Sequence, residues 1–568
     1  MLFFGENSMS IQAPGKKVRL AITRYFHSVL LLSGMLILLF LILDHFLHGG
    51  TTLSHFEKYL YIVLIAGAIL LFLGGFWTGT TKGRQWFARL ARVTENEIIV
   101  ADQDRYIRII GWLIFLTAYA IVFVAYLDIK YSVIHLDAAR YFNDTLGYIQ
   151  SGSYGITDIR FWSARRAFTV PLFYSISGYT LSNYSQQDVM ERISRYQSFF
   201  SIFSWGILAI SFSLGMKRRF SKIIAFAIIL LLGASLYVTQ WDRSMLAESI
   251  STSSMVLLMG FLIMGEVLWD RRQPIPIWIM VLLLTFTLLS AIFFTFARDT
   301  NAYLLLAFSG LMFIGLFFSS TRTHPLFRAY LIIMAGFLVI FSLHNLTVNK
   351  SRYVQSIFDV VLYRMIPNQE SLNYLIAHGM PYDESYMFMT SLNLKQLDDL
   401  KMSNEKLQNL YTWVSDHGVN VLASYLLSHP LYTLSAPFKD IQGWANSENS
   451  GYRMVLVPIS SRIRLLSTLM YLRWDWSPVL FLALFFASVG MIGYGRQRES
   501  LWVFVFSLFI SVYPMALLIW HGDPGELQRH IFQVALQLRL AAWMLIVMMF
   551  ERGLIRVQER NKTNKQLV

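Results

Sequence analysis

The densest group of polar and charged residues in this sequence stands between residues 521 and 539, with apolar runs on both sides. The candidate binding residues in it are His521, Glu526, Arg529, His530 and Arg539, and the arginines and histidines among them suit an anionic substrate. Arg539 lies about two turns inside the last apolar run, where a lone charge needs a partner. A guanidinium matches phosphate oxygens with forked contacts, so a phosphate is a suitable partner. An arginine–glutamate pair between membrane spans is the structural alternative.

The same segment also contains side chains that ligate metals. His521, Asp523 and His530 are chemically able to bind a divalent ion, but they have no firm ligand spacing. The sequence has no cysteine, so disulfides, thiol catalysis and thiolate ligands are excluded. We therefore expect no cofactor, and a divalent metal stays open as the alternative.

A second polar group follows the third apolar run, in the segment His135-Leu-Asp-Ala-Ala-Arg-Tyr-Phe-Asn-Asp144. Asp137, Arg140 and Asp144 recur at helical spacing, which predicts a helix along the membrane surface. Within this segment Asp137 is the acid nearest to the apolar run, where a partly desolvated carboxylate can act as a general base. The alternative is that these charges form the solvated face of an interfacial helix.

Two further charged positions stand at the predicted outer ends of membrane spans. Glu248 opens an apolar helix, and Arg298 stands beside Asp299 in a tight turn. The helix macrodipole favours an acid in the first turn, so capping alone would account for Glu248. An Arg–Asp turn is often only a local salt bridge. If all four groups meet instead, they form an outer-facing cavity of carboxylates and cations that suits an anionic, lipid-borne ligand.

Membrane helices must position these residues, because the composition excludes an ordinary soluble enzyme. The chain has 568 residues, of which 55% are hydrophobic and 14% are charged, whereas soluble domains carry about 25% charged residues. About twelve apolar runs are long enough to cross a bilayer core of roughly 30 Å. They lie near residues 28–47, 59–77, 108–127, 197–215, 222–239, 249–269, 276–296, 301–318, 328–345, 477–495, 501–520 and 531–550.

The basic residues predict the orientation of the chain. The formal net charge is +14, and the short loops on one side of the apolar runs are richer in Lys and Arg than those on the other side, for example at 16–24, 82–92 and 217–222. The positive-inside rule then places both termini in the cytoplasm, and the four polar groups on the outer face of a cell's inner (plasma) membrane. Such tracts also contact anionic lipid headgroups, and no segment resembles a nucleic-acid-binding module.

This orientation predicts the domain organisation. A segment of about 130 residues on the outer face could form a small domain, and its apolar stretch 419–427 is too short to span, so it predicts an interfacial or re-entrant helix. The predicted parts are a two-span addition with a cytoplasmic loop at 1–107, a transmembrane core at 108–345 with an outer loop at 128–196, the outer segment at 346–476, three spans at 477–550 and a basic cytoplasmic tail at 551–568.

The layout of residues 108–550 resembles the GT-C superfamily, the membrane glycosyltransferases that use polyprenyl-phosphate sugars. The resemblance rests on "HLDAARYFNDTLGYIQSGSYG" in the first large outer loop, "MLAESIS" at the head of the sixth span and "GDPGELQRH" before the last span. It implies an all-α GT-C-like fold of about twelve transmembrane helices with interfacial helices in the first outer loop. Family members often have an adjacent acidic pair in that loop, whereas here Ala138 follows Asp137.

The resemblance also implies an activity and a site. The enzyme would move a sugar, with inversion, from a polyprenyl-phosphate donor to a glycan, lipid or protein acceptor, with Asp137 as the catalytic base. It implies that the substrate and its phosphate are bound by Arg140, Glu248, Arg298, His521, Glu526, Arg529, His530 and Arg539.

Two other functions remain open at the level of sequence. An O-antigen ligase or polymerase also has about a dozen spans and a large outer loop, and depends on Arg and His in late outer loops. A transporter or lipid flippase predicts broken helices and charges near the bilayer midplane, often with internal repeats. Here the charges gather at the outer edge and no repeat is visible, which favours the transferase.

Overall fold

The computed structural model describes the chain from residue 99 onward, with gaps. The chain divides into two compact units, Met1–Thr117 with Ser460–Arg462, and Ala118–Ile459 with Ile463–Val568. The spans expected near 28–47 and 59–77 lie outside the described residues. The described residues are 99–136, 138–162, 166–270, 276–316, 325–348, 353–392, 396–397, 400, 403–446, 459–472, 476–494, 500–522, 524 and 527–567.

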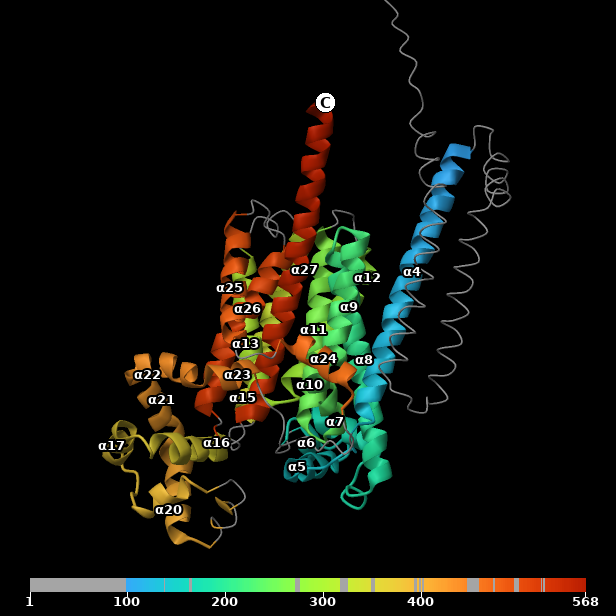
Figure 1. Cartoon of the computed structure of the whole chain (residues 1–568). Helices are drawn as coiled ribbons and strands as arrows, with labels where there is room; N and C mark the ends of the chain where they lie inside the picture. Colours follow the sequence, from blue (N-terminus) through green and yellow to red (C-terminus); the bar gives the residue numbers. More distant parts are fainter. Residues whose placement is uncertain are drawn as a thin grey trace, which may run out of the picture. The chain divides into compact units, whose positions relative to one another are not determined.

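Long apolar helices supply the membrane part of the protein (Figure 1). They are α4 (Ile99–Ile134), α8 (Gln187–Gly215), α9 (Arg219–Ala234), α11 (Ala247–Asp270), α12 (Ile277–Thr295), α13 (Asp299–Gly315), α15 (Pro325–Val348), α25 (Ser477–Tyr494), α26 (Ser500–Gly522) and α27 (Leu527–Leu567). Among the described residues, six helices are long and apolar enough to cross a membrane. A seventh span results if α9 is counted with α10 (Leu236–Thr239) and the 3-10 helix η1 (Gln240–Arg243), which bend away from it by 50°.

The predicted helical class is therefore confirmed, but twelve spans are not. In the described part of the chain the only β pairing is an isolated parallel bridge between Arg140 and Ser244. The expected spans near 301–318, 328–345 and 477–495 form the helices α13, α15 and α25, and within α15 and α25 the apolar stretches among the described residues are Arg328–His344 and Ser477–Ile492.

The membrane helices differ in how much of their surface is covered by protein. In the apolar windows of α11 and α27, 83% and 89% of the residues are buried, compared with 28% in α12. Lipid tails are as apolar as leucine, so a helix such as α12 can leave its side chains facing lipid without cost. Because α11 and α27 are shielded from lipid, they are the helices that can carry charged side chains at membrane depth.

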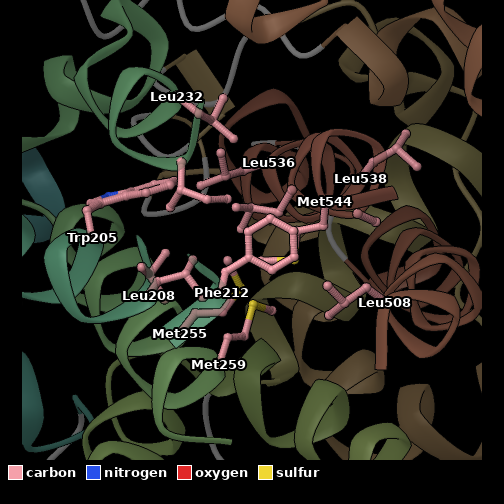
Figure 2. Close-up of a cluster of buried hydrophobic side chains, with 14 of the residues drawn as sticks. Trp205, Leu208, Phe212, Leu232, Met255, Met259, Leu508, Leu536, Leu538 and Met544 are labelled. Atoms are coloured by element: carbon pink, nitrogen blue, oxygen red, sulfur yellow. The ribbon is translucent and has the colours of Figure 1, made fainter. Parts of the chain in front are cut away.

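The membrane core is built by side chains from helices that are distant in sequence. Trp205 and Phe212 of α8, Met255 of α11 and Leu536 of α27 meet there (Figure 2). The backbones of α8 and α11 approach closely at Gly260, where an added Cβ would lie 3.0 Å from the backbone nitrogen of Leu208. A small residue at this point allows the two helices to pack without a gap.

Short helices follow α4 along the chain. They are α5 (Asn143–Gly152), α6 (Ile159–Trp162) and α7 (Thr169–Ser177). The helix expected through Asp137, Arg140 and Asp144 is not formed, because residues 138–142 are extended and α5 begins only at Asn143. The physical reason is a long-range pairing: the amide of Arg140 donates to the carbonyl of Arg243 at 2.9 Å, and its carbonyl accepts from the amide of Met245 at 2.8 Å.

The segment of residues 346–476, which the sequence predicts on the outer face, has its own hydrophobic core. Buried residues such as Phe358, Leu362, Leu410 and Val414 pack together there, which confirms that this segment is folded mainly as helix. Its elements are α16 (Tyr353–Val360), the π-helix η3 (Val361–Met365), α17 (Gln369–Ala377), α18 (Ser385–Met389), α20 (Glu405–Trp413), the π-helix η4 (Val414–Gly418), α21 (Val419–Ser428), α22 (Pro430–Ser435), the 3-10 helix η5 (Ala436–Asp440) and α23 (Ile441–Asn446), and α24 (Ser461–Tyr471) follows.

Candidate functional site

Glu248 lies at the centre of a buried cluster of charged side chains. It belongs to the first turn of α11, and its side chain is 1% exposed. Its Oε1 lies 2.9 Å from Nε of Arg529, in the first turn of α27, and 3.5 Å from Nη1 of Arg298, which directly precedes α13. The structure therefore brings together three of the predicted site residues from three helices.

Asp144 extends this cluster to the short helices. It lies in the first turn of α5, and its Oδ2 accepts from Nη1 of Arg529 at 2.9 Å. Its Oδ1 accepts from Nη2 of Arg166 at 2.6 Å. Burial favours the neutral carboxyl, but the Arg166 and Arg529 guanidiniums outweigh it and hold the pKa of Asp144 well below its usual range. Asp144 therefore remains ionised and joins α5 to α27.

The balance of charge in this cluster favours an anion. Three guanidiniums, from Arg166, Arg298 and Arg529, face two carboxylates, from Asp144 and Glu248, which leaves a net charge of about +1. Nη2 of Arg298 is buried and donates no hydrogen bond to the described residues. A buried donor of this kind costs free energy until an acceptor reaches it, and a phosphate oxygen is a suitable acceptor. We call these five residues the outer charge cluster, after the face on which the sequence predicts them.

A layer of neutral polar side chains lies next to the outer charge cluster. Ser251 of α11 accepts hydrogen bonds at 2.9 Å from Nδ2 of Asn301 and from Nε2 of Gln533. These three residues follow Glu248, Arg298 and Arg529 by three or four positions on the same segments. Side chains at that spacing lie one helical turn apart. The amide–hydroxyl contacts therefore fix the spacing of the helices that carry the charges.

Two other predicted residues adjoin the outer charge cluster without joining its ion pairs. Nε2 of His530 lies 3.2 Å from Nη2 of Arg529. Arg140 contributes its backbone, which holds the extended segment against the junction of η1 and α11. Asp137, the predicted base, and Glu526 lie outside the described residues. Arg140, three residues after Asp137 in the chain, pairs through its backbone with Arg243 and Met245. Met245 stands three residues before Glu248.

His521 and Arg539 have different surroundings. Nε2 of His521 lies 2.9 Å from the carbonyl oxygen of Thr433, and its ring lies near Tyr432, so it joins α26 to α22. Arg539 is fully buried ten residues beyond Arg529, which is about 15 Å of helix rise. The structure therefore does not place either residue among the ion pairs of the outer charge cluster.

Arg539 closes the end of a neighbouring helix. It donates from Nε to the carbonyl of Tyr471, the last residue of α24, and from Nη1 to the carbonyl of Ala535 at 2.8 Å. Its guanidinium carbon lies 3.8 Å from the ring centroid of Tyr471 and 5.3 Å from that of Phe481. Carbonyls at a helix C-terminus need donors, and aromatic faces attract cations. These contacts compensate a charge at membrane depth.

A second buried ion pair lies outside the predicted site. Nζ of Lys130 in α4 lies 2.9 Å from Oδ2 of Asp242 in η1 and donates to Oγ of Ser201 at 2.9 Å. Oδ1 of Asp242 accepts from Oγ of Ser249, the residue after Glu248, at 2.5 Å. The neighbouring Arg243 pairs with Glu191 of α8. These contacts fix η1, whose end pairs with the extended segment after α4.

Sequence reasoning missed Asp144, Arg166, Lys130 and Asp242 as parts of the site. One available signal was that each charge near the end of an apolar run requires a buried partner. It would have marked Lys130 and Asp242, but not their pairing. Arg166 had no signal, because it lies in a polar loop. Within the described residues no group of three His, Asp or Glu residues is arranged to hold a metal ion.

Comparisons with known proteins identify no family. No family model matches the chain. No curated protein matches it either. Among solved structures it is similar to "Archaeal oligosaccharyltransferase AglB from Archaeoglobus fulgidus in complex with an inhibitory peptide and a dolichol-phosphate", with 11% sequence identity and a TM-score of 0.40. The match covers 79% of this chain and 52% of that one, so this chain spans about half the length of that protein.

Proposed function

We propose that this protein is an integral membrane glycosyltransferase that moves a sugar from a polyprenyl-phosphate donor to a glycan, lipid or protein acceptor on the outer face of a cell's inner membrane. The observation that supports it is the outer charge cluster, where Arg298 and Arg529 meet around Glu248 at the ends of apolar helices. A donor whose phosphate is attached to a lipid would bring its anion to this depth. The guanidiniums would then hold it through forked hydrogen bonds.

The proposed reaction is a displacement at the anomeric carbon of the sugar. The acceptor hydroxyl attacks that carbon, a new glycosidic bond forms on the opposite face, and the bond from the carbon to the phosphate oxygen breaks. Asp137 takes the hydroxyl proton, and the polyprenyl phosphate leaves with the electron pair of the broken bond. Arg298 and Arg529 stabilise the charge that develops on the phosphate as it leaves.

The position of the charges favours transfer over transport. A transporter places its binding site near the bilayer midplane, at discontinuous helices. Here Glu248 and Arg529 belong to the first turns of α11 and α27, at the ends of those helices. The buried Arg539 lies deeper, but backbone carbonyls and aromatic rings compensate it. An anion held at the end of a span can meet an acceptor on the outer face without crossing the membrane.

The proposal is tested by transfer in membranes that contain Asp137→Asn. The donors are synthetic polyprenyl-phosphate hexoses and pentoses, and a membrane extract from the native cell supplies the acceptor. We expect released polyprenyl phosphate to fall by about 10²–10⁴-fold, because the amide keeps the shape of the carboxylate but cannot take the proton. Asp158→Asn is the matched control, because among the described residues the carboxylate of Asp158 contacts only the side chain and backbone amide of Arg160, two residues further along the chain.

Two outcomes would contradict the proposal. The first is release of polyprenyl phosphate by Asp137→Asn at the rate of the unaltered protein. The second is movement of the labelled donor to the other leaflet with no new glycosidic bond, which would favour the lipid or oligosaccharide transporter. An O-antigen ligase or polymerase remains the enzymatic alternative, and it predicts that His530→Gln abolishes transfer while Asp137→Asn retains it.

A further inference from the structure

The end of α21, α22 and η5 expose a stripe of large apolar side chains. Leu427 and Leu431 are 82% and 84% exposed, and Leu434 and Phe438 are 54% and 50% exposed. Leu431, Leu434 and Phe438 are separated by three and four residues along α22 and η5, which is the spacing of one helical face, and Leu427 stands at the end of α21, just before the break at His429. Four large apolar side chains this exposed on one face are unusual for a surface that contacts only water.

The opposite side of the segment formed by the end of α21, α22 and η5 is covered by protein. Val421 and Tyr425 of α21 belong to the hydrophobic core of the outer segment. Ala436 and Pro437 of η5 are also buried. The element is therefore amphipathic in the sense that one face holds it to the outer segment and the other face is left bare.

The bare face continues onto a membrane-spanning helix. The ring of Phe438 stacks on Tyr513 of α26, with the ring centroids 5.1 Å apart. The hydroxyl of Tyr513 also donates to the carbonyl of Leu434. A few residues nearer to the end of α26, Leu518 is 37% exposed. The apolar stripe therefore adjoins the membrane-spanning helix α26 at Tyr513.

The contact with α26 also defines a depth. The apolar span in α26 is Leu501–Gly522, and its 22 residues cover about 33 Å, close to the thickness of a bilayer core. Tyr513 stands nine residues before Gly522, which is about 13 Å from the end of that span. Phe438, which touches Tyr513, therefore lies within the apolar length of α26 and not beyond it.

We propose that α22 and η5 insert into the outer leaflet of the bilayer, with Leu427, Leu431, Leu434 and Phe438 among the acyl chains. Figure 1 shows α22 and α23 running across the direction of the long helices α25, α26 and α27, which is the orientation of an interfacial helix. Lys439 follows the stripe, with its Nζ 6.0 Å from the ring of Tyr432, and its long side chain reaches the headgroups.

The consequence is that the outer segment is held to the membrane at a second place besides the helices that flank it in sequence. This inference does not depend on the proposed transferase activity. Acyl chains cover the stripe, because it adjoins α26 at a depth that a bilayer must cover.

The test uses the fact that the chain has no cysteine. Leu431→Cys is labelled with an environment-sensitive fluorophore in the full-length protein, which is then reconstituted in vesicles of phosphatidylcholine and phosphatidylglycerol. Lipids with a nitroxide on the acyl chain quench from the bilayer, and iodide quenches from water. Asn409→Cys is the matched control, because Asn409 is exposed on α20 of the same outer segment.

We expect the label at position 431 to be quenched several-fold more by the nitroxide lipids than the label at position 409, and several-fold less by iodide. Equal quenching by iodide at both positions would contradict the proposal, because the stripe would face water. Protection of position 431 from both quenchers would also contradict it, because a second copy or another protein would then cover the stripe. Leu431→Cys replaces an exposed side chain, so the variant keeps the packed face of the element.

Discussion

Two arginines on α27, ten residues apart, are both buried but have opposite kinds of partner. Arg529 pairs with the carboxylates of Glu248 and Asp144, and it shares Glu248 with Arg298. Arg539 has backbone carbonyls and aromatic faces as its neighbours. Burial of a cation at membrane depth therefore does not identify a substrate site. The partners distinguish the two arginines, because carboxylates hold Arg529 in a charged, polar cluster, whereas Arg539 donates two hydrogen bonds to backbone carbonyls.

The largest expected effect concerns the stability that Arg539 provides. Arg539→Ala removes two hydrogen bonds from a charged group and a desolvated cation–π contact, so we expect a loss of about 3–5 kcal/mol in the free energy of unfolding. The melting temperature in detergent measures it. The affinity of the folded fraction for polyprenyl phosphate should be unchanged. Reduced affinity with an unaltered melting temperature would reverse the comparison between the two arginines.

A smaller effect is expected at Arg529, and it should appear in binding. Arg529→Ala removes a guanidinium that would contact the phosphate, worth about 1.5–3 kcal/mol or roughly a tenfold to hundredfold loss of affinity for polyprenyl phosphate. The variant also leaves Glu248 with fewer partners, so the melting temperature should fall. The double variant Arg529→Ala with Glu248→Gln should regain much of the melting temperature but none of the affinity. Recovery of both would show that Arg529 acts only in the ion pair.

A matched control separates buried from exposed arginines. Arg160 pairs with Asp158 and its side chain is 68% exposed. Exposed ion pairs contribute little to stability because water and salt screen them, so Arg160→Ala should change neither the melting temperature nor the affinity for polyprenyl phosphate by a measurable amount. A loss of affinity as large as that in Arg529→Ala would mean that the anion binds through general surface charge.

The smallest expected effect is the response of the outer charge cluster to pH. The pKa of Asp144 is lowered in the folded protein by Arg166 and Arg529, despite its burial. A carboxylate whose pKa is lowered by folding stabilises the folded protein at pH values above its unfolded pKa of about 3.9. This stabilisation is lost as the pH falls through the pKa of the folded state. The difference in melting temperature between the unaltered protein and Asp144→Asn should therefore be constant from about pH 8 to about pH 5. A difference that disappears near neutral pH would mean that Asp144 is not held as an anion.

The sequence predicts the membrane helices and part of the site for identifiable physical reasons. Apolar runs are local, so α8, α11, α12, α26 and α27 are found close to where they were expected. The sequence singled out Glu248, Arg298 and Arg529 because a charge at the end of an apolar run is costly. Their meeting is a property of helix packing, which no local pattern encodes.

The features that the sequence did not predict depend on contacts between residues far apart in the chain. Residues 138–142 have the spacing of a helix, yet their backbone pairs with residues 243–245, about a hundred positions away. More than a hundred positions in sequence also separate Lys130 from Asp242 and Asp144 from Arg529. Arg539 was predicted to bind phosphate because a lone charge inside an apolar run needs a partner, and the structure shows backbone carbonyls and aromatic rings around it. The carbonyl of Tyr471, which it contacts, belongs to a helix that the sequence did not mark.

The central claim is that a lipid phosphate binds at Arg298 and Arg529 and not at Arg539. Polyprenyl phosphate with a photoactivatable group next to its phosphate, bound to the protein in nanodiscs and crosslinked by light, tests it directly. We predict crosslinks to residues 296–301 and 527–533 that an excess of unlabelled polyprenyl phosphate removes. Competed crosslinks confined to residues around Arg539 and Tyr471, with none at those two segments, would contradict the claim.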